Sequence, residues 1–180
     1  MSKLFTALIS TAIFIGIFFT CITSPTAQTV PDHIVISEVY YNASTATNQF
    51  IELYNPTLEP VSLDGWNLSH YDETGNLVWS LEFDSSHTIP AHSYYLIGRS
   101  PTITIPDVGI VDSDVTFTGA LEAGPDDYLN LTNESDTYID GVRWGHEGGN
   151  TPPEIIDVPD NTYVAPNATE GKSIHRRILV

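Results

Sequence analysis

The sequence predicts an all-β domain, either a sandwich or a barrel, and three observations support this fold class. Short runs of strand-forming residues follow one another from residue 33 onward, with turn residues between them. After the first 22 residues, no segment repeats its apolar residues with a helical period. The stretches "LDGW", "ETGN" and "IDGV" supply Asp-Gly and Gly-Asn corners of the kind that join strands. The 180 residues are enough for one domain with its own core.

Each strand is expected where β-branched and aromatic residues gather between turn residues. "HIVISEVYY" and "QFIELYN" open the series, and Asn55-Pro56 is a stop signal after the second. The later runs, among them "LVWSLEF", "SYYLIG" and "DYLNLT", have the same composition. The expected strands cover residues 33–41, 49–55, 61–69, 77–83, 93–98, 108–117, 127–132, 137–144 and 172–179. Residues 145–171 are rich in Pro, Gly and Asn, so we expect a long excursion before the last strand.

The first two expected strands each carry a carboxylate inside an apolar run, Glu38 in one and Glu52 in the other. Residues on both faces of these strands are apolar, so the alternation of side chains leaves open which face is the core. An ionised carboxylate inside a sandwich is tolerable only when it is paired and hydrogen-bonded. We therefore expect Glu38 or Glu52 to pair with Arg176, or with Arg143 as the second choice, in a structural role and with a depressed glutamate pKa.

The N-terminal segment is typical of an export signal. "MSKLFTALISTAIFIGIFFTCI" has one Lys near its start and then an almost unbroken apolar run. Residues 1–27 are expected to be a signal peptide, or an uncleaved membrane anchor because the apolar run approaches the length of a membrane span. Residues 28–32 then form a short linker and residues 33–180 the domain. The mature domain is expected to be secreted or extracytoplasmic.

Charge and cysteine content exclude several classes of partner and chemistry. Six Lys and Arg stand against 23 Asp and Glu, giving a net charge of −17. Such a chain is acidic and soluble and is a poor partner for nucleic acid. The only cysteine, Cys21, lies in the expected signal. The mature domain therefore has no thiol for a disulfide, a cysteine nucleophile or a cysteine-ligated metal.

The order of motifs along the chain resembles the lamin tail domain family in its exported bacterial and archaeal form. The most specific stretch is "FIELYNPTLEPVSLDGWNLS", and "GKSIHRR" resembles the closing strand of the family. This resemblance covers about residues 33–177 and implies an immunoglobulin-like β-sandwich with Trp66 in the core. It implies no catalysis, and we expect no cofactor. The motif residues are Glu38, Glu52, Asn55, Pro56, Leu63, Gly65, Trp66, Ser173 and Arg176. The coiled-coil rod of a nuclear lamin is absent, so the nuclear role does not transfer.

Catalytic and metal motifs are scarce, and we predict no catalytic residues. The sequence contains no G-x-S-x-G, H-E-x-x-H or phosphate-cradling glycine loop. Glu38 and Glu52 could form a glycosidase pair only across a cleft, and His87 and His92 are interpreted as loop histidines. Candidate calcium ligands are the loop aspartates Asp112, Asp114, Asp126 and Asp127, although none matches an EF-hand loop.

Two further features bear on surface chemistry. Asn-x-Ser/Thr tripeptides, which are acceptors for glycosylation, begin at Asn42, Asn67, Asn130, Asn133 and Asn167. Tyr94 and Tyr95 are adjacent in a strand, so one of them must face outward, as aromatic residues do on many carbohydrate-binding sandwiches.

Together these features predict a non-enzymatic, exported interaction module of the cell surface or envelope, acting in protein contact, adhesion or envelope organisation. The expected partner is an envelope or extracellular protein or a polysaccharide, with membrane contact only through an uncleaved N-terminal segment. The alternative is a module that binds polysaccharide or calcium through its loops. A hydrolase of unrecognised type is the third hypothesis.

Overall fold

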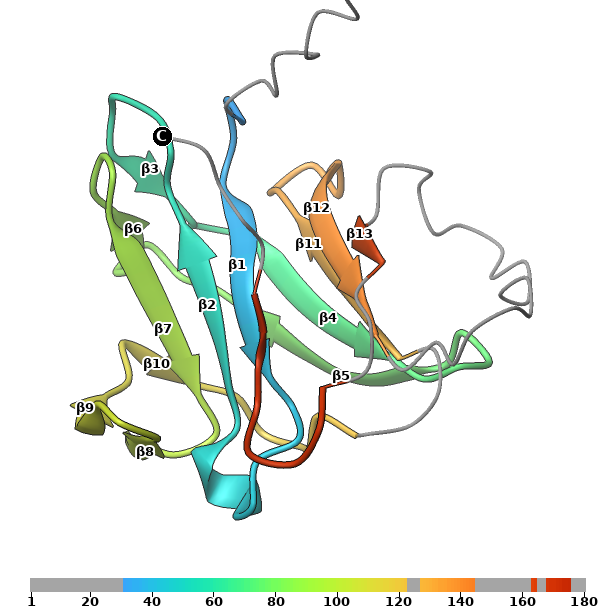
Figure 1. The fold of residues 1–180 in the computed structure, drawn as a ribbon. Helices are drawn as coiled ribbons and strands as arrows, with labels where there is room; N and C mark the ends of the chain where they lie inside the picture. Colours follow the sequence, from blue (N-terminus) through green and yellow to red (C-terminus); the bar gives the residue numbers. More distant parts are fainter. Residues whose placement is uncertain (1–30, 123–126, 145–162, 165–167, 176–180) are drawn as a thin grey trace, which may run out of the picture.

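The computed structural model describes residues 31–122, 127–144, 163–164 and 168–175, and within these ranges it is almost entirely β. Two five-stranded sheets pack face to face, which confirms the predicted immunoglobulin-like sandwich (Figure 1). The expected signal segment lies outside the described residues. No helix within the described ranges is long and apolar enough to span a membrane.

The front sheet in Figure 1 has the strand order β10-β7-β2-β1-β14. Its members are β1 (Val35–Tyr40), β2 (Phe50–Tyr54), β7 (Tyr94–Gly98), β10 (Val115–Thr116) and β14 (Ile174–His175). β1, β2, β7 and β14 pair antiparallel, whereas β10 runs parallel to β7. Ile174 of the expected closing strand pairs with Val39 of β1, while Arg176 lies outside the described residues.

The back sheet has the order β13-β12-β11-β4-β5. Its members are β4 (Asn67–Tyr71), β5 (Leu77–Glu82), β11 (Tyr128–Thr132), β12 (Tyr138–Arg143) and β13 (Tyr163–Val164). β13 falls inside the expected excursion of residues 145–171 and pairs parallel with β12, so this part of the chain holds a short strand that the sequence did not suggest.

Two small sheets and one helical turn complete the described structure. β3 (Val61–Ser62) pairs with β6 (Thr88–Ile89), and β8 (Thr102–Ile105) forms a hairpin with β9 (Gly109–Asp112). The turn η1 (Ala46–Asn48) is a 3₁₀ helix between β1 and β2. The expected strands 61–69 and 108–117 are therefore each divided in two, by the corner before Trp66 and by a break at Ser113-Asp114. β6 and β8 were not expected.

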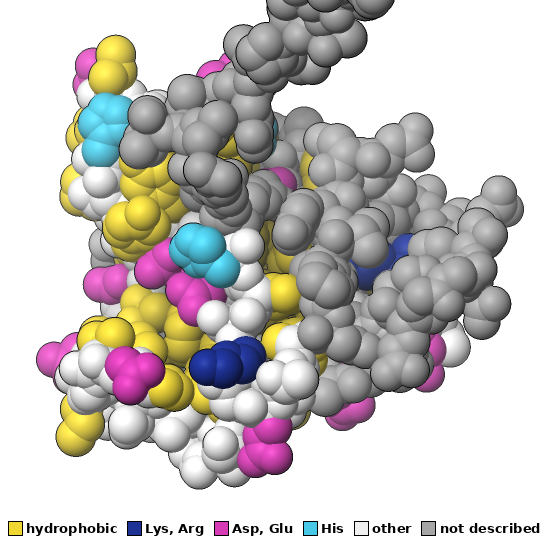
Figure 2. Space-filling view, viewed as in Figure 1, with side chains coloured by type: hydrophobic (Ala, Val, Ile, Leu, Met, Phe, Trp, Pro, Cys, Tyr) yellow, Lys and Arg dark blue, Asp and Glu magenta, His cyan; other side chains and the backbone are white. Residues whose placement is uncertain are grey.

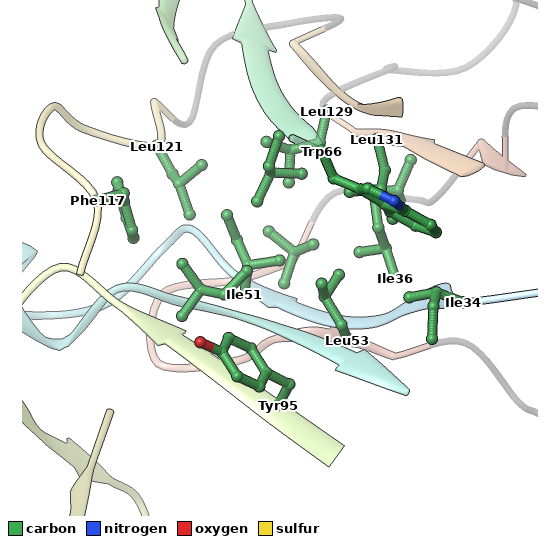
Figure 3. Packing of buried hydrophobic residues seen from close by; sticks show 14 of the residues in the cluster. Ile34, Ile36, Ile51, Leu53, Trp66, Tyr95, Phe117, Leu121, Leu129 and Leu131 are labelled. Atoms are coloured by element: carbon green, nitrogen blue, oxygen red, sulfur yellow. The ribbon is translucent and has the colours of Figure 1, made fainter. Parts of the chain in front are cut away.

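The core lies between the two large sheets. Side chains of Ile36, Ile51 and Leu53 from the front sheet meet Leu129 and Leu131 from the back sheet (Figure 3). Trp66 is 9% exposed and belongs to the same cluster, as does the fully buried Leu63. Burial of this apolar surface supplies the main driving force for folding, at about 25 cal/mol per Å².

The Asn-Pro stop and the Leu-Asp-Gly-Trp corner stabilise the turns that position residues in this core. Asn55 is fully buried, and its amide nitrogen donates to the carbonyl oxygens of Glu59, Ile89 and Pro90. Its side-chain oxygen accepts from the backbone and hydroxyl of Thr57. Gly65 has φ +73, which only glycine adopts without strain, and this turn places Leu63 and Trp66 in the core.

Candidate interaction surface on the front sheet

A register irregularity in β1 decides on which face of the sheet Glu38 lies. Ile36 pairs with Leu53, but the next pair is Glu38 with Glu52, so Ser37 is an extra residue in β1. Such a bulge re-aims the side chains that follow it. Ile36 and Val39 then both belong to the core, and Glu38 lies on the outer face of the front sheet beside Glu52.

The bulge residue Ser37 forms a hydrogen bond with the side chain of Glu52. Its side chain is 1% exposed, and its hydroxyl donates to Oε1 of Glu52 at 2.6 Å and lies 3.1 Å from the carbonyl oxygen of the same residue. Burial raises the pKa of Glu52, the Ser37 hydrogen bond opposes this rise, and the charge of Glu38 adds to it. The expected depression of a glutamate pKa is therefore wrong for Glu52.

The structure describes a histidine beside one of these carboxylates, whereas the expected pairing with Arg176 stays a prediction. Nδ1 of His175 on β14 lies 3.7 Å from Oε2 of Glu38. Arg143, the second expected partner, is 5% exposed on β12 of the back sheet. Arg176, the first choice, lies outside the described residues. Within the described residues, the group that lies within ion-pair distance of these carboxylates is thus a histidine, which is charged only when protonated.

Aromatic side chains flank the carboxylates along this face. Tyr94 at the start of β7 is 60% exposed, and its ring packs on Tyr54 of β2 with centroids 4.6 Å apart. Tyr95, its neighbour, points inward instead (Figure 3). Figure 2 looks onto this face and shows acidic side chains and a histidine near its middle, with hydrophobic side chains to either side.

A pocket of about 180 Å³ opens beside Glu38, between β14 and the β8–β9 hairpin. Tyr40 and Phe50 lie in its wall, with ring centroids 5.4 Å apart, and Ile103 of the hairpin packs against both. Lys172 and Ser173, which precede β14, line the other side. We name this surface the front-face site: Ser37, Glu38, Glu52, Tyr54, Tyr94 and His175, with the adjoining pocket.

The three calcium candidates that the structure describes do not form a metal-binding group. Asp112 is exposed in β9, whereas Oδ2 of Asp114 accepts a hydrogen bond from the backbone of Leu96. Asp127 is 2% exposed and lies 3.5 Å from Nε2 of the buried His70. Asp126 lies outside the described residues. In the part of the chain that the structure describes, no three His, Cys, Asp or Glu side chains form a group that could hold a metal.

The histidine pair is divided between two environments. His87 forms a hydrogen bond with the Tyr95 hydroxyl through Nδ1 and lies 3.6 Å from Asp84 through Nε2. His92 is exposed and occupies a turn with φ +53. Asp84, His87 and Tyr95 are arranged like a catalytic relay, but Tyr95 is buried and burial raises its pKa to about 12, so its hydroxyl is a poor nucleophile.

The glycosylation candidates have different surroundings. The amide nitrogen of Asn42 donates to Ala168, and the side-chain oxygen of Asn133 accepts from Ser135 and Thr137. Asn67 and Asn130 are half-buried on β4 and β11, and Asn167 lies outside the described residues. Glycosylation at these positions stays a prediction.

Sequence reasoning found both carboxylates and Tyr94 but missed Ser37, Tyr54 and His175. The sequence "VISEVY" does not indicate that Ser37 forms a bulge. The packing of Tyr54 on Tyr94 depends on the register between two strands, which the sequence does not specify.

Comparison with known families settles the class of the domain. A model of the lamin tail domain family matches residues 27–146. The chain belongs to the lamin tail domain family. Lamin tail domains form a non-catalytic, immunoglobulin-like domain family. A search of curated proteins found no match.

Proposed function

We propose that this lamin tail domain is an exported, non-enzymatic interaction module that holds a positively charged segment of an envelope or extracellular protein on its front-face site. The observation that carries the proposal is the Glu38–Glu52 pair, in which two like charges are direct cross-strand partners on a half-buried face. Like charges so placed destabilise a sheet by about 0.2–1 kcal/mol. A bound cation would offset that cost.

The surroundings of the pair favour a lysine or arginine side chain. The raised pKa of Glu52 shows that burial outweighs the groups that stabilise its charge. Tyr94 presents an exposed ring beside it, and aromatic faces attract ammonium and guanidinium groups. The net charge of −17 steers basic partners toward the domain.

Binding of a lysine-rich peptide, measured by calorimetry at low and at physiological salt, tests this proposal. We expect binding that weakens with salt and is lost in the double variant Glu38→Gln/Glu52→Gln. The matched control is Glu59→Gln/Glu73→Gln, which removes the same charge from exposed positions away from the site. Equal loss of binding in both double variants would show that only net charge matters, which contradicts the proposal.

Export is tested separately, by fractionating cells that produce the full chain or a chain lacking residues 2–27. The apolar N-terminal run supports an extracytoplasmic location for the full chain. The truncated chain is expected to stay in the cytoplasm, and its appearance outside would contradict the export part of the proposal.

Polysaccharide is the second candidate partner, and the exposed ring of Tyr94 on Tyr54 favours it. Sugar rings pack on exposed aromatic faces, whereas a cationic peptide depends mainly on the carboxylates. Tyr94→Ala should therefore abolish polysaccharide binding but weaken peptide binding only in part.

A further inference from the structure

The hydroxyl of Ser37 determines which oxygen of the Glu52 carboxylate faces the sheet. The Ser37 side chain is 1% exposed, and its hydroxyl donates to Oε1 of Glu52 at 2.6 Å. A carboxylate oxygen held this closely by a buried group lies against the sheet. Oε2 is therefore the oxygen of Glu52 that is left for a partner.

The carboxylate of Glu38 is restricted on one side as well. Its Oε2 lies 3.7 Å from Nδ1 of His175 on β14. A guanidinium nitrogen has to come within about 2.7–2.9 Å of a carboxylate oxygen, and the imidazole ring occupies the approach to Oε2 from the side of β14. Neither Glu38 nor Glu52 therefore presents both of its oxygens freely.

The two carboxylates together fit an ammonium group. Directly opposite residues of an antiparallel pair have Cβ atoms about 4.5–5.5 Å apart, so Glu38 and Glu52 can each give one oxygen to the same cation. An ammonium is a compact charge whose three N–H donors can point at separate oxygens. A guanidinium is planar and bonds best to both oxygens of one carboxylate. The geometry of the pair thus favours lysine.

We propose that Ser37 makes the front-face site selective for lysine over arginine, because it holds Oε1 of Glu52 and leaves an ammonium site between single oxygens of Glu38 and Glu52. This inference rests on the proposed function and names the residue type that the basic segment of the partner supplies. Ser37 acts through Glu52 and is a positioning residue. The selectivity is the reverse of the general one, since arginine is the common partner of carboxylates and also stacks on aromatic rings such as that of Tyr94.

Calorimetry of the full chain with two peptides tests the selectivity. The peptides have equal charge and differ only in carrying lysine or arginine at every basic position. At pH 8 we expect the lysine peptide to bind at least about threefold more tightly. Equal affinities, or tighter binding of the arginine peptide, would overturn this inference and leave the proposed function standing. Binding of neither peptide would contradict the proposed function, and this inference with it.

Ser37→Ala tests whether Ser37 is the cause of the selectivity. Without the hydroxyl both oxygens of Glu52 can turn outward, so the preference for lysine should disappear or reverse. Ser37→Thr keeps a hydroxyl and should retain the preference. Ser80→Ala, which removes an exposed serine of the back sheet, is the control and should leave the preference unchanged. An unchanged preference in a Ser37→Ala chain that is folded by circular dichroism would overturn the proposal.

Glu52→Gln tests the same geometry without altering the bulge residue, and it decides the question if Ser37→Ala does not fold. This change leaves Glu38 as the single carboxylate of the pair. It should therefore weaken binding of the lysine peptide more than binding of the arginine peptide, and the preference should disappear. A preference for lysine that persists in Glu52→Gln would overturn the proposal.

The pH profile of lysine binding gives a readout that a purely structural role of Ser37 would not change. Burial raises the pKa of Glu52, the Ser37 hydrogen bond lowers it, and the charge of Glu38 raises it. His175 and Tyr94 are the other titratable groups that interact with Glu52. Loss of the hydrogen bond should raise the pKa of Glu52 further, so as pH falls the Ser37→Ala chain should lose lysine binding at a higher pH than the wild type. Identical pH profiles for the two chains would overturn the proposal.

Discussion

Glu38 and Glu52 are direct partners across the antiparallel β1–β2 pair, and the bulge at Ser37 turns Glu38 to the outer face, where Glu52 already lies by the alternation of β2. Without the extra residue, Glu38 and the core residue Ile36 would share one face, because side chains alternate along a strand. The bulge therefore removes a charge from the core and creates the like-charge pair of the front-face site. The positively charged partner of the proposed function would bind at this like-charge pair.

The pH dependence of stability should report the raised pKa of Glu52. A carboxyl whose folded pKa lies above its unfolded value, near 4.5, favours folding fully below that value and loses this contribution as pH rises through the folded pKa. We expect Glu52→Gln to stabilise the domain at pH 7 by up to about 1 kcal/mol and to match the wild type near pH 4.5. Urea unfolding at both pH values measures this difference, with Glu59→Gln as the exposed control. A destabilised Glu52→Gln domain at pH 7 would indicate a cationic partner within the chain.

Glu38→Lys should separate stability from binding. The new ammonium group would face Glu52 across the strands, and replacing a like-charge pair with an opposite pair is expected to stabilise the domain by about 0.5–1 kcal/mol. The same change fills the site with the domain's own cation, so binding of the lysine-rich peptide should fall at least about tenfold, or about 1.4 kcal/mol. Thermal melting and calorimetry on the same sample measure the two effects. A variant that becomes both less stable and weaker in binding would show only that the face is disturbed.

Asn55→Ala should be among the most destabilising single changes. It leaves the carbonyl groups of Ile89 and Pro90 without their amide donor in a buried setting, and each unsatisfied group costs about 1–3 kcal/mol. We expect a loss of about 3 kcal/mol in the free energy of unfolding, measured in urea. Asn76→Ala, which removes an exposed amide bonded to Asp72, should cost less than about 1 kcal/mol. Similar losses for the two variants would mean that Asn55 is not the anchor that its contacts indicate.

The fold could be predicted because its signals are local. The side chain of Asn55 stabilises the turn that follows it, and the positive φ angle of Gly65 favours glycine at the second turn. Trp66 comes directly after Gly65, so a short stretch of sequence specifies both a corner and a core residue. β6 and β8 were missed because two to four residues of strand carry too little pattern to stand out.

The site was harder to predict because it depends on register. The orientation of Glu38 depends on one extra residue in β1, and a shift by one residue exchanges the two faces of a strand. His175 reaches Glu38 only because β14 pairs with β1, a contact between segments more than 130 residues apart. Neither relationship can be derived from composition or spacing.

The corner at Gly65 gives a final test of how local strain and packing combine. Gly65 and Gly171 have nearly equal φ angles, +73 and +77, so Ala at either position should cost about 1–2 kcal/mol in backbone strain. A Cβ at Gly65 would also lie 3.1 Å from Cβ of Glu134 in the β11–β12 turn, whereas one at Gly171 would meet nothing within 4 Å. Gly65→Ala should therefore be the more destabilising change in urea unfolding.

A double-variant cycle separates the contact from the strain. In a Glu134→Gly background the opposing Cβ is absent, so the cost of Gly65→Ala should fall to that of Gly171→Ala. If Gly65→Ala instead costs the same free energy of unfolding in both backgrounds, the β11–β12 turn moves aside without cost. The glycine is then required for its φ angle alone. In either case the turn at Gly65 positions Leu63 and Trp66 in the core that both sheets share, so Gly65→Ala should lower the stability of the whole domain.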